Sequence, residues 1–365
     1  MGPSRAAAEE QTNRADEMEL CRVHAQGAPM KTTFAGIEMG SAEFAQEIAG
    51  SLRRVEDLLI SELSSGEDFL TEAATHLAKA GGKRFRPLFA LLSAQFGPQP
   101  RADEVITAAT VIELIHLATL YHDDVMDEAT MRRGAVSANA RWGNSVAILA
   151  GDFLFARASR LVSTLGPDSV LIIADTFAEL VTGQMRETIG TTAGASAVDH
   201  YLKVVWEKTA VLISAAGRFG AMTSGADAET TDRLARLGGI VGTAFQVSDD
   251  IIDISSASGE SGKTPGTDLR EGVHTLPVLY ALDDPECVRL RELLLTPSGE
   301  RRPVTDDAEV DEALSLLIAS SGMSRARETL ADYAEQARAE LDVLPDNDAK
   351  AAFSSLVRYT VERSG

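Results

Sequence analysis

The chain has little cysteine and little proline, and no run of apolar residues is long enough to cross a membrane. Its 365 residues include only Cys21 and Cys287, far apart and without C-x-x-C spacing, which excludes a disulfide framework and a cysteine metal site. The most apolar stretch, residues 105–121, is interrupted by Glu113 and His116 and predicts a buried helix. No signal peptide is recognisable at the start, so we expect a cytoplasmic protein.

Positive charge is also scarce. The chain carries 34 Lys and Arg against 55 Asp and Glu, which gives a net charge of -21. This balance argues against general affinity for nucleic acid or for anionic membranes. A phosphate-bearing partner would therefore have to be bound by local clusters of basic residues.

The organisation of the chain predicts an all-α fold. Residues 1–40 mix Ala, Glu, Arg, Gly and Pro without periodicity and predict a disordered extension, followed by one helical domain over residues 41–365. Polar loops are expected at 255–271 and 296–309. Helical patterns are predicted at 42–63, 69–79, 88–96, 102–128, 145–165, 170–188, 199–223, 228–254, 276–282, 310–320 and 324–361.

Two D-D-x-x-D clusters follow apolar helical runs. The first contains Asp123, Asp124 and Asp127, and the second contains Asp249, Asp250 and Asp253. On a helix the first and last aspartates of each cluster share a face, where like charges repel and favour a bound cation. Magnesium suits such a site because it takes one or two carboxylates and completes its octahedron with phosphate and water. An acidic chain can produce one such triplet by chance, but two on apolar helices point to magnesium and a diphosphate.

Basic residues gather in two places that suit a phosphate. The segment G-G-K-R-F-R-P at 81–87 places Lys83, Arg84 and Arg86 in a loop that Pro87 turns into a helix start, where backbone N–H groups also favour anions. Arg132 and Arg133 follow the first aspartate cluster and offer guanidinium groups to the same phosphate. The alternative for this pair is an ordinary C-terminal helix cap before Gly134.

Three further residues are weaker signals taken singly. Lys208, in W-E-K-T at 206–209, and Lys263, in the loop after the second aspartate cluster, can each be an ordinary surface lysine. His116 lies two helical turns before Asp123, where it could donate a hydrogen bond to a bound diphosphate. A core histidine whose hydrogen bonds are satisfied is an equally good interpretation of His116.

Five segments of the chain, taken in order, resemble the signature set of the trans-isoprenyl diphosphate synthases, the polyprenyl synthetase family. They are G-G-K-R-F-R-P, E-L-I-H-L-A-T-L-Y-H-D-D-V-M-D, R-R-G, K-T and F-Q-V-S-D-D-I-I-D. The resemblance runs from about residue 42 to the C-terminus. It implies an all-helical bundle around a central cavity, usually a homodimer. It also implies a magnesium-dependent prenyltransferase that adds isopentenyl diphosphate to an allylic diphosphate, with two or three Mg²⁺ ions and at most peripheral membrane contact.

The resemblance also assigns roles to residues. It implies that the metal ligands and their supporting carboxylates are Asp123, Asp124, Asp127, Asp249, Asp250 and Asp253. It implies that the allylic diphosphate is held by Arg132, Lys208 and Lys263, and that isopentenyl diphosphate is held by Lys83, Arg86, His116 and Arg133. Arg84 of the basic loop is a further candidate for substrate binding. Thr209 and Gln246 would face the reacting allyl group. Many relatives have a lysine where this chain has Val273, and Arg270 or His274 is a candidate to replace it.

Small residues before the first aspartate cluster predict a long product. In the family, bulky aromatic residues there stop chain growth, whereas this chain has Ala118 and Thr119 one helical turn upstream. The resemblance therefore implies about seven to ten isoprene units, as in quinone side chains. Alternatives are a farnesyl or geranylgeranyl diphosphate synthase, a subunit of a heteromeric synthase, a terpene cyclase, and an HD-type metal phosphohydrolase. The last two fit less well because the second D-D-x-x-D is intact and an upstream histidine motif is missing.

Overall fold

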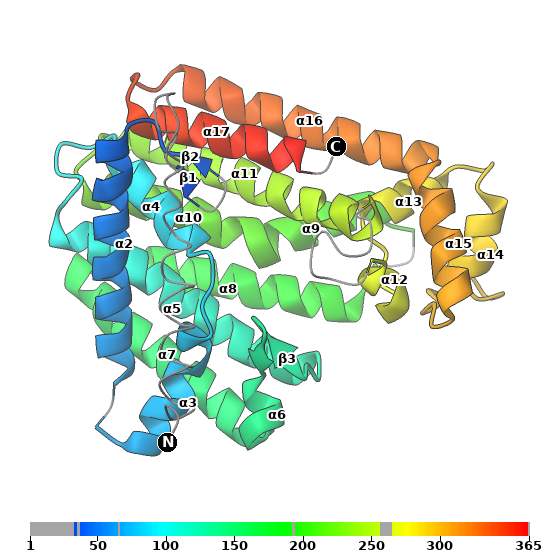
Figure 1. The fold of residues 1–365 in the computed structure, drawn as a ribbon, viewed down its shortest axis with the longest axis horizontal. Helices are drawn as coiled ribbons and strands as arrows, with labels where there is room; N and C mark the ends of the chain where they lie inside the picture. The colour runs from blue at the N-terminus through cyan, green and yellow to red at the C-terminus, as the bar shows by residue number, and fades with distance from the viewer. Residues whose placement is uncertain (1–32, 35–36, 65, 192–193, 256–264, 364–365) are drawn as a thin grey trace, which may run out of the picture. The chain divides into compact units, whose positions relative to one another are not determined.

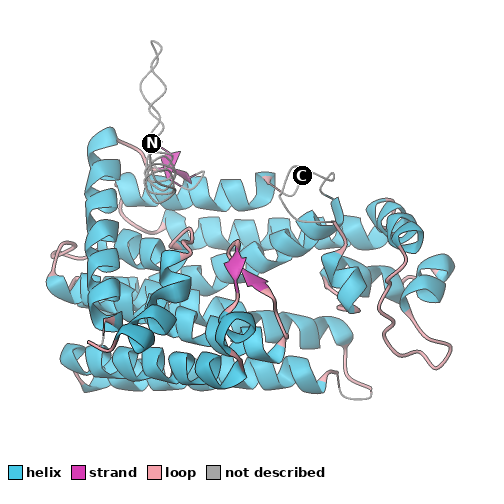
Figure 2. Ribbon diagram, turned by 60° about the horizontal axis from the view of Figure 1, so that its bottom comes forward, coloured by secondary structure: helices cyan, strands magenta, loops and turns pink. Residues whose placement is uncertain are grey.

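The computed structural model describes residues 33–34, 37–64, 66–191, 194–255 and 265–363. Within these ranges nearly all regular structure is helical, and the named strands form two short hairpins (Figure 2). The predicted all-α class is confirmed. Lys263 and residues 1–32 of the predicted extension lie outside the described residues. Ile37 and Met39, at the end of that extension, are buried side chains.

The described residues group into two compact units, and several helices contribute to both. The first unit takes its residues from Met1–Leu171, Ala216–Asp232 and Val343–Leu356, and the second from Ile172–Ala215, Arg233–Asp342 and Val357–Gly365. Each aspartate cluster belongs to a different unit.

The first unit is built mainly from the helices in the first half of the chain (Figure 1). Its elements are β1 (Thr33–Phe34), β2 (Ile37–Glu38), α2 (Ala42–Leu63), α3 (Asp68–Lys79), α4 (Phe85–Ala94), α5 (Asp103–Met126), β3 (Met131–Arg132), β4 (Ala135–Val136), α6 (Ala138–Trp142), α7 (Asn144–Val162), the 3₁₀ turn η1 (Ser163–Leu165) and parts of α8 (Pro167–Ile189), α10 (Val211–Thr223), α11 (Ala228–Ser255) and α17 (Asp348–Glu362).

Helix α5 forms the centre of the first unit, packed against α2, α4 and α7. By length and composition it could cross a membrane, yet 72% of its most apolar window is buried inside the protein. The buried helix predicted from residues 105–121 is confirmed. Helix α7 approaches α5 closely because position 151 is glycine, where a Cβ atom would lie 2.3 Å from Nε2 of His122.

Helix α2 shows how the sequence determines an element. Its buried residues Phe44, Ile48 and Leu52 recur at helical spacing, and the Ser41 side chain accepts a hydrogen bond from the Phe44 N–H at 3.2 Å. The cap and the apolar face together explain why the predicted range 42–63 matches the observed one.

The second unit contains the second aspartate cluster and the rest of the chain. Its elements are α8 (Pro167–Ile189), α9 (Ala197–Val205), the π-helical segment η2 (Trp206–Ala210), α10 (Val211–Thr223), α11 (Ala228–Ser255), α12 (Thr267–Glu271), α13 (Leu276–Asp283), α14 (Val288–Leu294), α15 (Asp307–Ile318), α16 (Ser321–Asp342) and α17 (Asp348–Glu362), with α8, α10, α11 and α17 shared.

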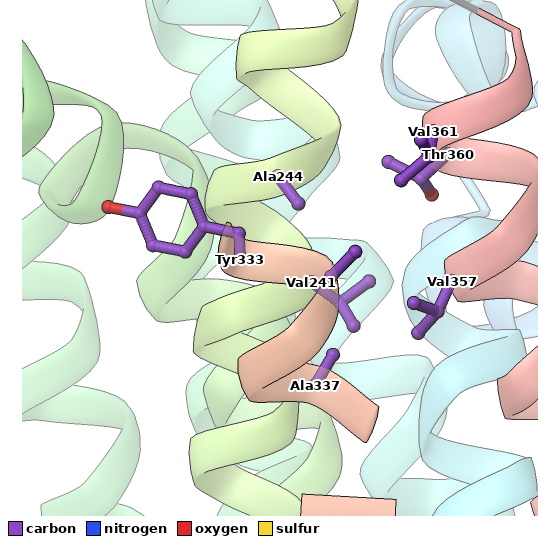
Figure 3. Close-up of a pocket in the computed structure, with 8 residues that line it drawn as sticks. Val241, Ala244, Tyr333, Ala337, Val357, Thr360 and Val361 are labelled. Carbon is purple, nitrogen blue, oxygen red and sulfur yellow. The ribbon is translucent and has the colours of Figure 1, made fainter. Parts of the chain in front are cut away.

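Helix α13 packs against α16 at the core of the second unit. A small apolar cavity is lined by residues of α11, α16 and α17, and Figure 3 shows the Tyr333 hydroxyl directed away from the valines. Its lining residues are Val241, Ala244, Tyr333, Ala334, Ala337, Val357, Thr360 and Val361. All are apolar except for two hydroxyl groups, so we interpret the cavity as a packing defect.

Several predicted boundaries were wrong. The final run 324–361 is two helices, α16 and α17, because Pro345 interrupts it and the Asn347 side chain accepts a hydrogen bond from the Lys350 N–H at 2.8 Å, which starts a new helix. The run 199–223 is divided by the π-helical segment. The hairpin β3–β4 and helices α12 and α14 were not predicted, and α12 lies in an expected loop.

Candidate functional site

The first aspartate cluster lies at the C-terminal end of α5. Asp123 is half-buried, Asp127 is exposed, and the Asp127 N–H donates to the Asp123 carbonyl at 2.8 Å where the helix ends. Asp124 is fully buried. The helix end therefore presents Asp123 and Asp127 toward the surface and turns Asp124 inward.

Asp124 is held by Arg132, which was predicted to hold a phosphate. The Arg132 Nε–H donates to Asp124 Oδ1 at 2.6 Å. Burial raises the pKa of Asp124, and the hydrogen bond from Arg132 opposes that rise. The other carboxylate oxygen, Oδ2, is buried and has no hydrogen-bond partner among the described residues. Such an oxygen favours a cation close by.

Arg132 and Arg133 belong to a tight hairpin. Arg133 (φ 54°) and Gly134 (φ 76°) form the two-residue turn between β3 and β4, where both residues need left-handed backbone conformations. The alternative interpretation of this pair as a helix cap was wrong, because α5 ends at Met126. The turn directs Arg133 back to the basic loop, where its Nη1 donates to the Leu77 carbonyl at 3.3 Å and to the Gly81 carbonyl.

The basic loop at 81–87 also has an unusual backbone. Arg84 has a φ of 47°, and Gly82 has a φ of 139° with the Arg133 guanidinium 2.8 Å from where its Cβ would be. Lys83 is exposed. Non-glycine residues in left-handed conformations are strained and are enriched at binding sites. The loop and the hairpin turn thus bring the two predicted basic clusters of this unit together.

Arg84 anchors this loop. Its guanidinium group pairs with Glu56, with Glu113 at 3.1 Å and with the carbonyl of Ala78 at 2.8 Å. Burial opposes the charge, but hydrogen bonds and attraction from the two glutamates outweigh it and raise the pKa of Arg84. Since these partners occupy its donors, we interpret Arg84 as the anchor of the loop, and the prediction that it binds substrate stays a prediction.

Arg86 and His116 form a second, partly buried contact in the cluster. Arg86 Nη1 lies 3.1 Å from His116 Nε2, and a guanidinium group can only donate, so Nε2 accepts and the imidazole is neutral. Burial and the positive charge of Arg86 lower the pKa of His116 well below its ordinary value. Burial also lowers the pKa of Arg86, to about 10, with Glu113 opposing. A neutral His116 leaves its Nδ1–H as a hydrogen-bond donor.

Glu113 is a residue that sequence reasoning missed. Its side chain is buried on α5, 3.1 Å from Arg84 and 3.8 Å from Arg133, and its charge also acts on Arg86. Burial raises the pKa of Glu113, and the three arginines oppose that rise. The available signal was a carboxylate inside an apolar helix, one turn before His116. Glu113 is the counter-ion that lets three arginines gather in a buried place.

The second aspartate cluster lies near the end of α11. Asp249 Oδ1 pairs with Arg363 Nη1 at 2.8 Å, and the Arg363 guanidinium lies over the Phe245 ring at 4.0 Å. Asp253 Oδ2 accepts from the Asp268 N–H at 3.3 Å. Asp249 and Asp253 are both half-buried. Arg363 was not predicted, because a basic residue near a chain end carries no signal of its partner.

Asp250 is buried and accepts two hydrogen bonds. The Gln246 Nε2–H donates to Oδ1 at 3.0 Å, and the Tyr201 hydroxyl donates to Oδ2. Burial raises the pKa of Asp250 to about 8, while the Tyr201 and Gln246 donors oppose the rise. Asp250 is thus turned into the protein, as Asp124 is in the first cluster.

Lys208 and Thr209 lie in the π-helical segment η2. Lys208 Nζ pairs with Glu187 of α8, and the Thr209 hydroxyl lies 3.4 Å from Gln246 Oε1. The structure therefore brings Thr209, Gln246 and Asp250 together. Position 183 on α8 must be glycine, since a Cβ there would lie 2.9 Å from backbone atoms of Glu207 and Lys208. π-Helical turns occur frequently at functional sites.

The residues predicted to control chain length lie on α5, one turn before Asp123. Ala118 is fully buried, and the half-buried Thr119 donates its hydroxyl to the His116 carbonyl at 2.9 Å. The Tyr121 hydroxyl points to α3, where it donates to the Ala73 carbonyl.

Arg270 and His274, the two candidates to replace the lysine that many relatives have at position 273, lie in different surroundings. Arg270 Nη1 pairs with Asp307 Oδ1 at 2.8 Å, and His274 is buried. Burial lowers the pKa of His274 to about 4, so its imidazole is neutral at pH 7 and cannot supply a positive charge. Arg270 is therefore the better candidate of the two.

The carboxylates suit magnesium in their chemistry. Among the described residues no three His, Cys, Asp or Glu side chains come close enough to form a metal site alone. Magnesium usually keeps water and substrate phosphate in its coordination sphere, so a protein need supply only one or two of its ligands. The partnerless oxygen of Asp124 and the half-buried Asp123 beside it provide hard oxygen ligands in the first unit.

Comparison with known proteins places the chain among enzymes of one type. The family profile described as polyprenyl synthetase matches residues 67–316. Nonaprenyl diphosphate synthase of Mycobacterium tuberculosis is 61% identical over 92% of this chain and 98% of its own length. Geranylgeranyl pyrophosphate synthase of Corynebacterium glutamicum, crystallised with calcium and isoprenyl diphosphate, is 52% identical with a TM-score of 0.80, covering 90% of this chain and 100% of its own. A decaprenyl diphosphate synthase of Rhodobacter capsulatus is 33% identical with a TM-score of 0.78, covering 88% and 98%.

Proposed function

The chain belongs to the polyprenyl synthetase family and is a prenyltransferase, and we propose that it makes a long-chain polyprenyl diphosphate of about 35 to 50 carbons. Its substrates are isopentenyl diphosphate and an allylic diphosphate. The observation that carries the proposal is the first unit's arrangement. There the carboxylates at the end of α5 lie beside Arg132, and the hairpin turn brings Arg133 to the basic loop.

Magnesium would be held by Asp123, Asp124 and Asp127 in the first unit and by Asp249 and Asp253 in the second, and it would supply positive charge to the departing diphosphate. Two or three ions are expected by resemblance. The similar synthase from Corynebacterium glutamicum was crystallised with calcium and isoprenyl diphosphate, which supports a divalent cation and a diphosphate as ligands.

The basic cluster of the first unit would bind isopentenyl diphosphate. Lys83 is exposed and can reach a phosphate, Arg86 and Arg133 are positioned by Glu113, and neutral His116 offers Nδ1–H. Fixed donors of this kind stabilise phosphate charge without reorganising during the reaction. In the second unit, Thr209 and Gln246 would face the allyl group, where their oxygens stabilise the carbocation that forms when the allylic C–O bond breaks.

Two observations support a long product. The nonaprenyl synthase of Mycobacterium tuberculosis is 61% identical, and Ala118 and Thr119 are small where a bulky side chain would stop growth. The geranylgeranyl synthase of Corynebacterium glutamicum, at 52% identity, makes a shorter product the alternative. A long product would serve as a quinone side chain.

We also propose a homodimer, supported by an exposed apolar stripe on α8. Ala178, Val181, Met185 and Ile189 share one face of the helix, and the last three are 44%, 58% and 78% exposed. Apolar side chains at this spacing fit the same face of a second copy. Val181→Glu with Met185→Glu should convert the dimer to a monomer in sedimentation velocity, whereas an unchanged dimer would assign the interface to another surface.

The proposed activity is tested by incubating the purified protein with Mg²⁺, labelled isopentenyl diphosphate and farnesyl diphosphate. Reverse-phase chromatography of the dephosphorylated products should show prenols of seven to ten units, absent from Asp123→Ala. Ala118→Phe should give shorter prenols than the wild type. Prenols of four units from the wild type would replace the long-chain assignment with a geranylgeranyl synthase, and no elongation with any primer would indicate a partner-dependent subunit.

A further inference from the structure

We propose that Tyr201 is a positioning residue that acts through Asp250 to fix the orientation of Gln246 and, with it, Thr209. The inference rests on the proposed function, since it assigns a role in the same reaction. It concerns a hydrogen-bonded chain of four side chains within the second unit, drawn from α9, the π-helical segment and α11.

The chain of contacts is continuous. The Tyr201 hydroxyl donates to Asp250 Oδ2, and Asp250 Oδ1 accepts from Gln246 Nε2 at 3.0 Å. Gln246 Oε1 then lies 3.4 Å from the Thr209 hydroxyl. Each side chain therefore uses one of its polar groups on the next.

Asp250 is the centre of this chain and is 4% exposed. A buried carboxylate needs hydrogen-bond donors, and losing one leaves an oxygen with a large desolvation cost. Tyr201 and Gln246 donate to different oxygens, so together they fix the rotation of the carboxylate group about its bond to Cβ. Without the Tyr201 hydroxyl, the carboxylate would be held at one oxygen only.

The carboxylate in turn decides which end of the Gln246 amide faces which way. In its ionised form Asp250 only accepts hydrogen bonds, so the amide presents its NH₂ group to Asp250 and leaves its carbonyl oxygen on the side of Thr209. The Thr209 hydroxyl can donate to that oxygen. Asp250 therefore determines that oxygen atoms, and not N–H groups, are presented beside Thr209.

This orientation has a consequence for a reaction that passes through a carbocation. An amide oxygen carries partial negative charge and stabilises a nearby positive carbon, whereas an amide NH₂ group in the same place would repel it. Tyr201 would not touch the substrate, and its effect would pass entirely through the side chains of Asp250 and Gln246.

The ring of Tyr201 is fixed by its surroundings. It packs against the apolar core of the second unit. It lies on α9 just before η2 begins at Trp206, so the same continuous helical run carries both Tyr201 and Thr209. A rigid aromatic ring on a helix is a better support than a flexible side chain on a loop.

The test is a double-mutant cycle with Tyr201→Phe, Gln246→Leu and the double variant, using steady-state kinetics of elongation. Tyr201→Phe keeps the ring and should lower kcat between about 10- and 100-fold with both KM values unchanged. In the Gln246→Leu background the same substitution should have no further effect, because the group through which it acts is gone. Tyr280→Phe is the matched control, since its hydroxyl contacts the Thr329 hydroxyl at 3.1 Å and, within the described ranges, no carboxylate.

Additive losses in the cycle would overturn the inference, as would a fall in kcat equal to that of Tyr280→Phe. A crystal structure of Tyr201→Phe gives a readout independent of activity: the Gln246 amide should turn away from Asp250, and an unchanged amide would refute the role. Wild-type elongation in the same assay distinguishes a failure of the Tyr201 inference from a failure of the proposed function. An inactive wild type refutes the proposed function, and the crystal structure still decides the role of Tyr201.

Discussion

Glu113→Gln should destabilise the protein far more than the same change in a surface ion pair. Glu113 lies 3.1 Å from Arg84, and the two side chains are 2% and 9% exposed, so neither charge is well solvated. The substitution keeps a hydrogen-bond acceptor but leaves Arg84, Arg86 and Arg133 with less compensating negative charge. Removing one partner of a buried pair costs about 3–5 kcal/mol, and because the amide can still accept we expect about 3 kcal/mol.

The assay is urea unfolding at pH 7, followed by circular dichroism. With a slope of about 3 kcal/mol/M, a loss of about 3 kcal/mol lowers the midpoint by about 1 M. The control is Glu47→Gln, whose partner Arg101 is 73% exposed, and an exposed pair of this kind contributes little to stability because water and salt screen it. Equal midpoints for the two variants would show that Glu113 is not an ionised counter-ion and would refute the reasoning.

Two other predictions concern pH and packing. The pKa of His116 is lowered in the folded protein, so as pH falls the imidazole takes up a proton in the unfolded chain first. The contribution of neutral His116 to folding stability is therefore fully present above the ordinary pKa of about 6.5 and is lost as pH falls below it. Between pH 7 and 5.5 the wild type should lose about 1 kcal/mol more than His116→Asn in urea titrations, and parallel losses would contradict a neutral His116. Gly220→Ala should destabilise the folded protein by about 1–3 kcal/mol, because the added Cβ would lie 2.0 Å from the Ala90 carbonyl oxygen. The control is Gly50→Ala on α2, where the Cβ would meet only an arginine tip at 3.8 Å, so this change should stabilise the protein by about 1 kcal/mol. Calorimetry that ranks the two variants the other way would refute this packing.

Local signals made much of the fold predictable. The Ser41 cap and a regular apolar face determine α2, and the absence of proline and glycine breaks determines most of α5. The sequence also indicated which residues carry the chemistry, since both aspartate clusters and the basic loop are short motifs. Those properties depend on neighbours in the chain, which a sequence shows directly.

The missed features depend on partners distant in the sequence. Glu113 pairs with Arg84 and Tyr201 with Asp250, and neither side chain carries a mark of its partner. The hairpin around Arg133 was missed because its turn uses left-handed conformations that R-G does not specify alone. The end of α16 was missed because the apolar pattern continues past Pro345, and the pattern was given more weight than the proline.

The protein should tolerate a one-residue deletion in the π-helical segment Trp206–Ala210 better than the same deletion in the following helix α10. A π turn holds one more residue than an α turn, so deleting one residue inside it lets the helix close as a regular α-helix with its axis continued. The same deletion in α10 would rotate every later side chain of that helix by roughly 100° and move its buried face away from the core. A deletion scan should therefore yield folded but inactive protein at the first place and aggregated protein at the second.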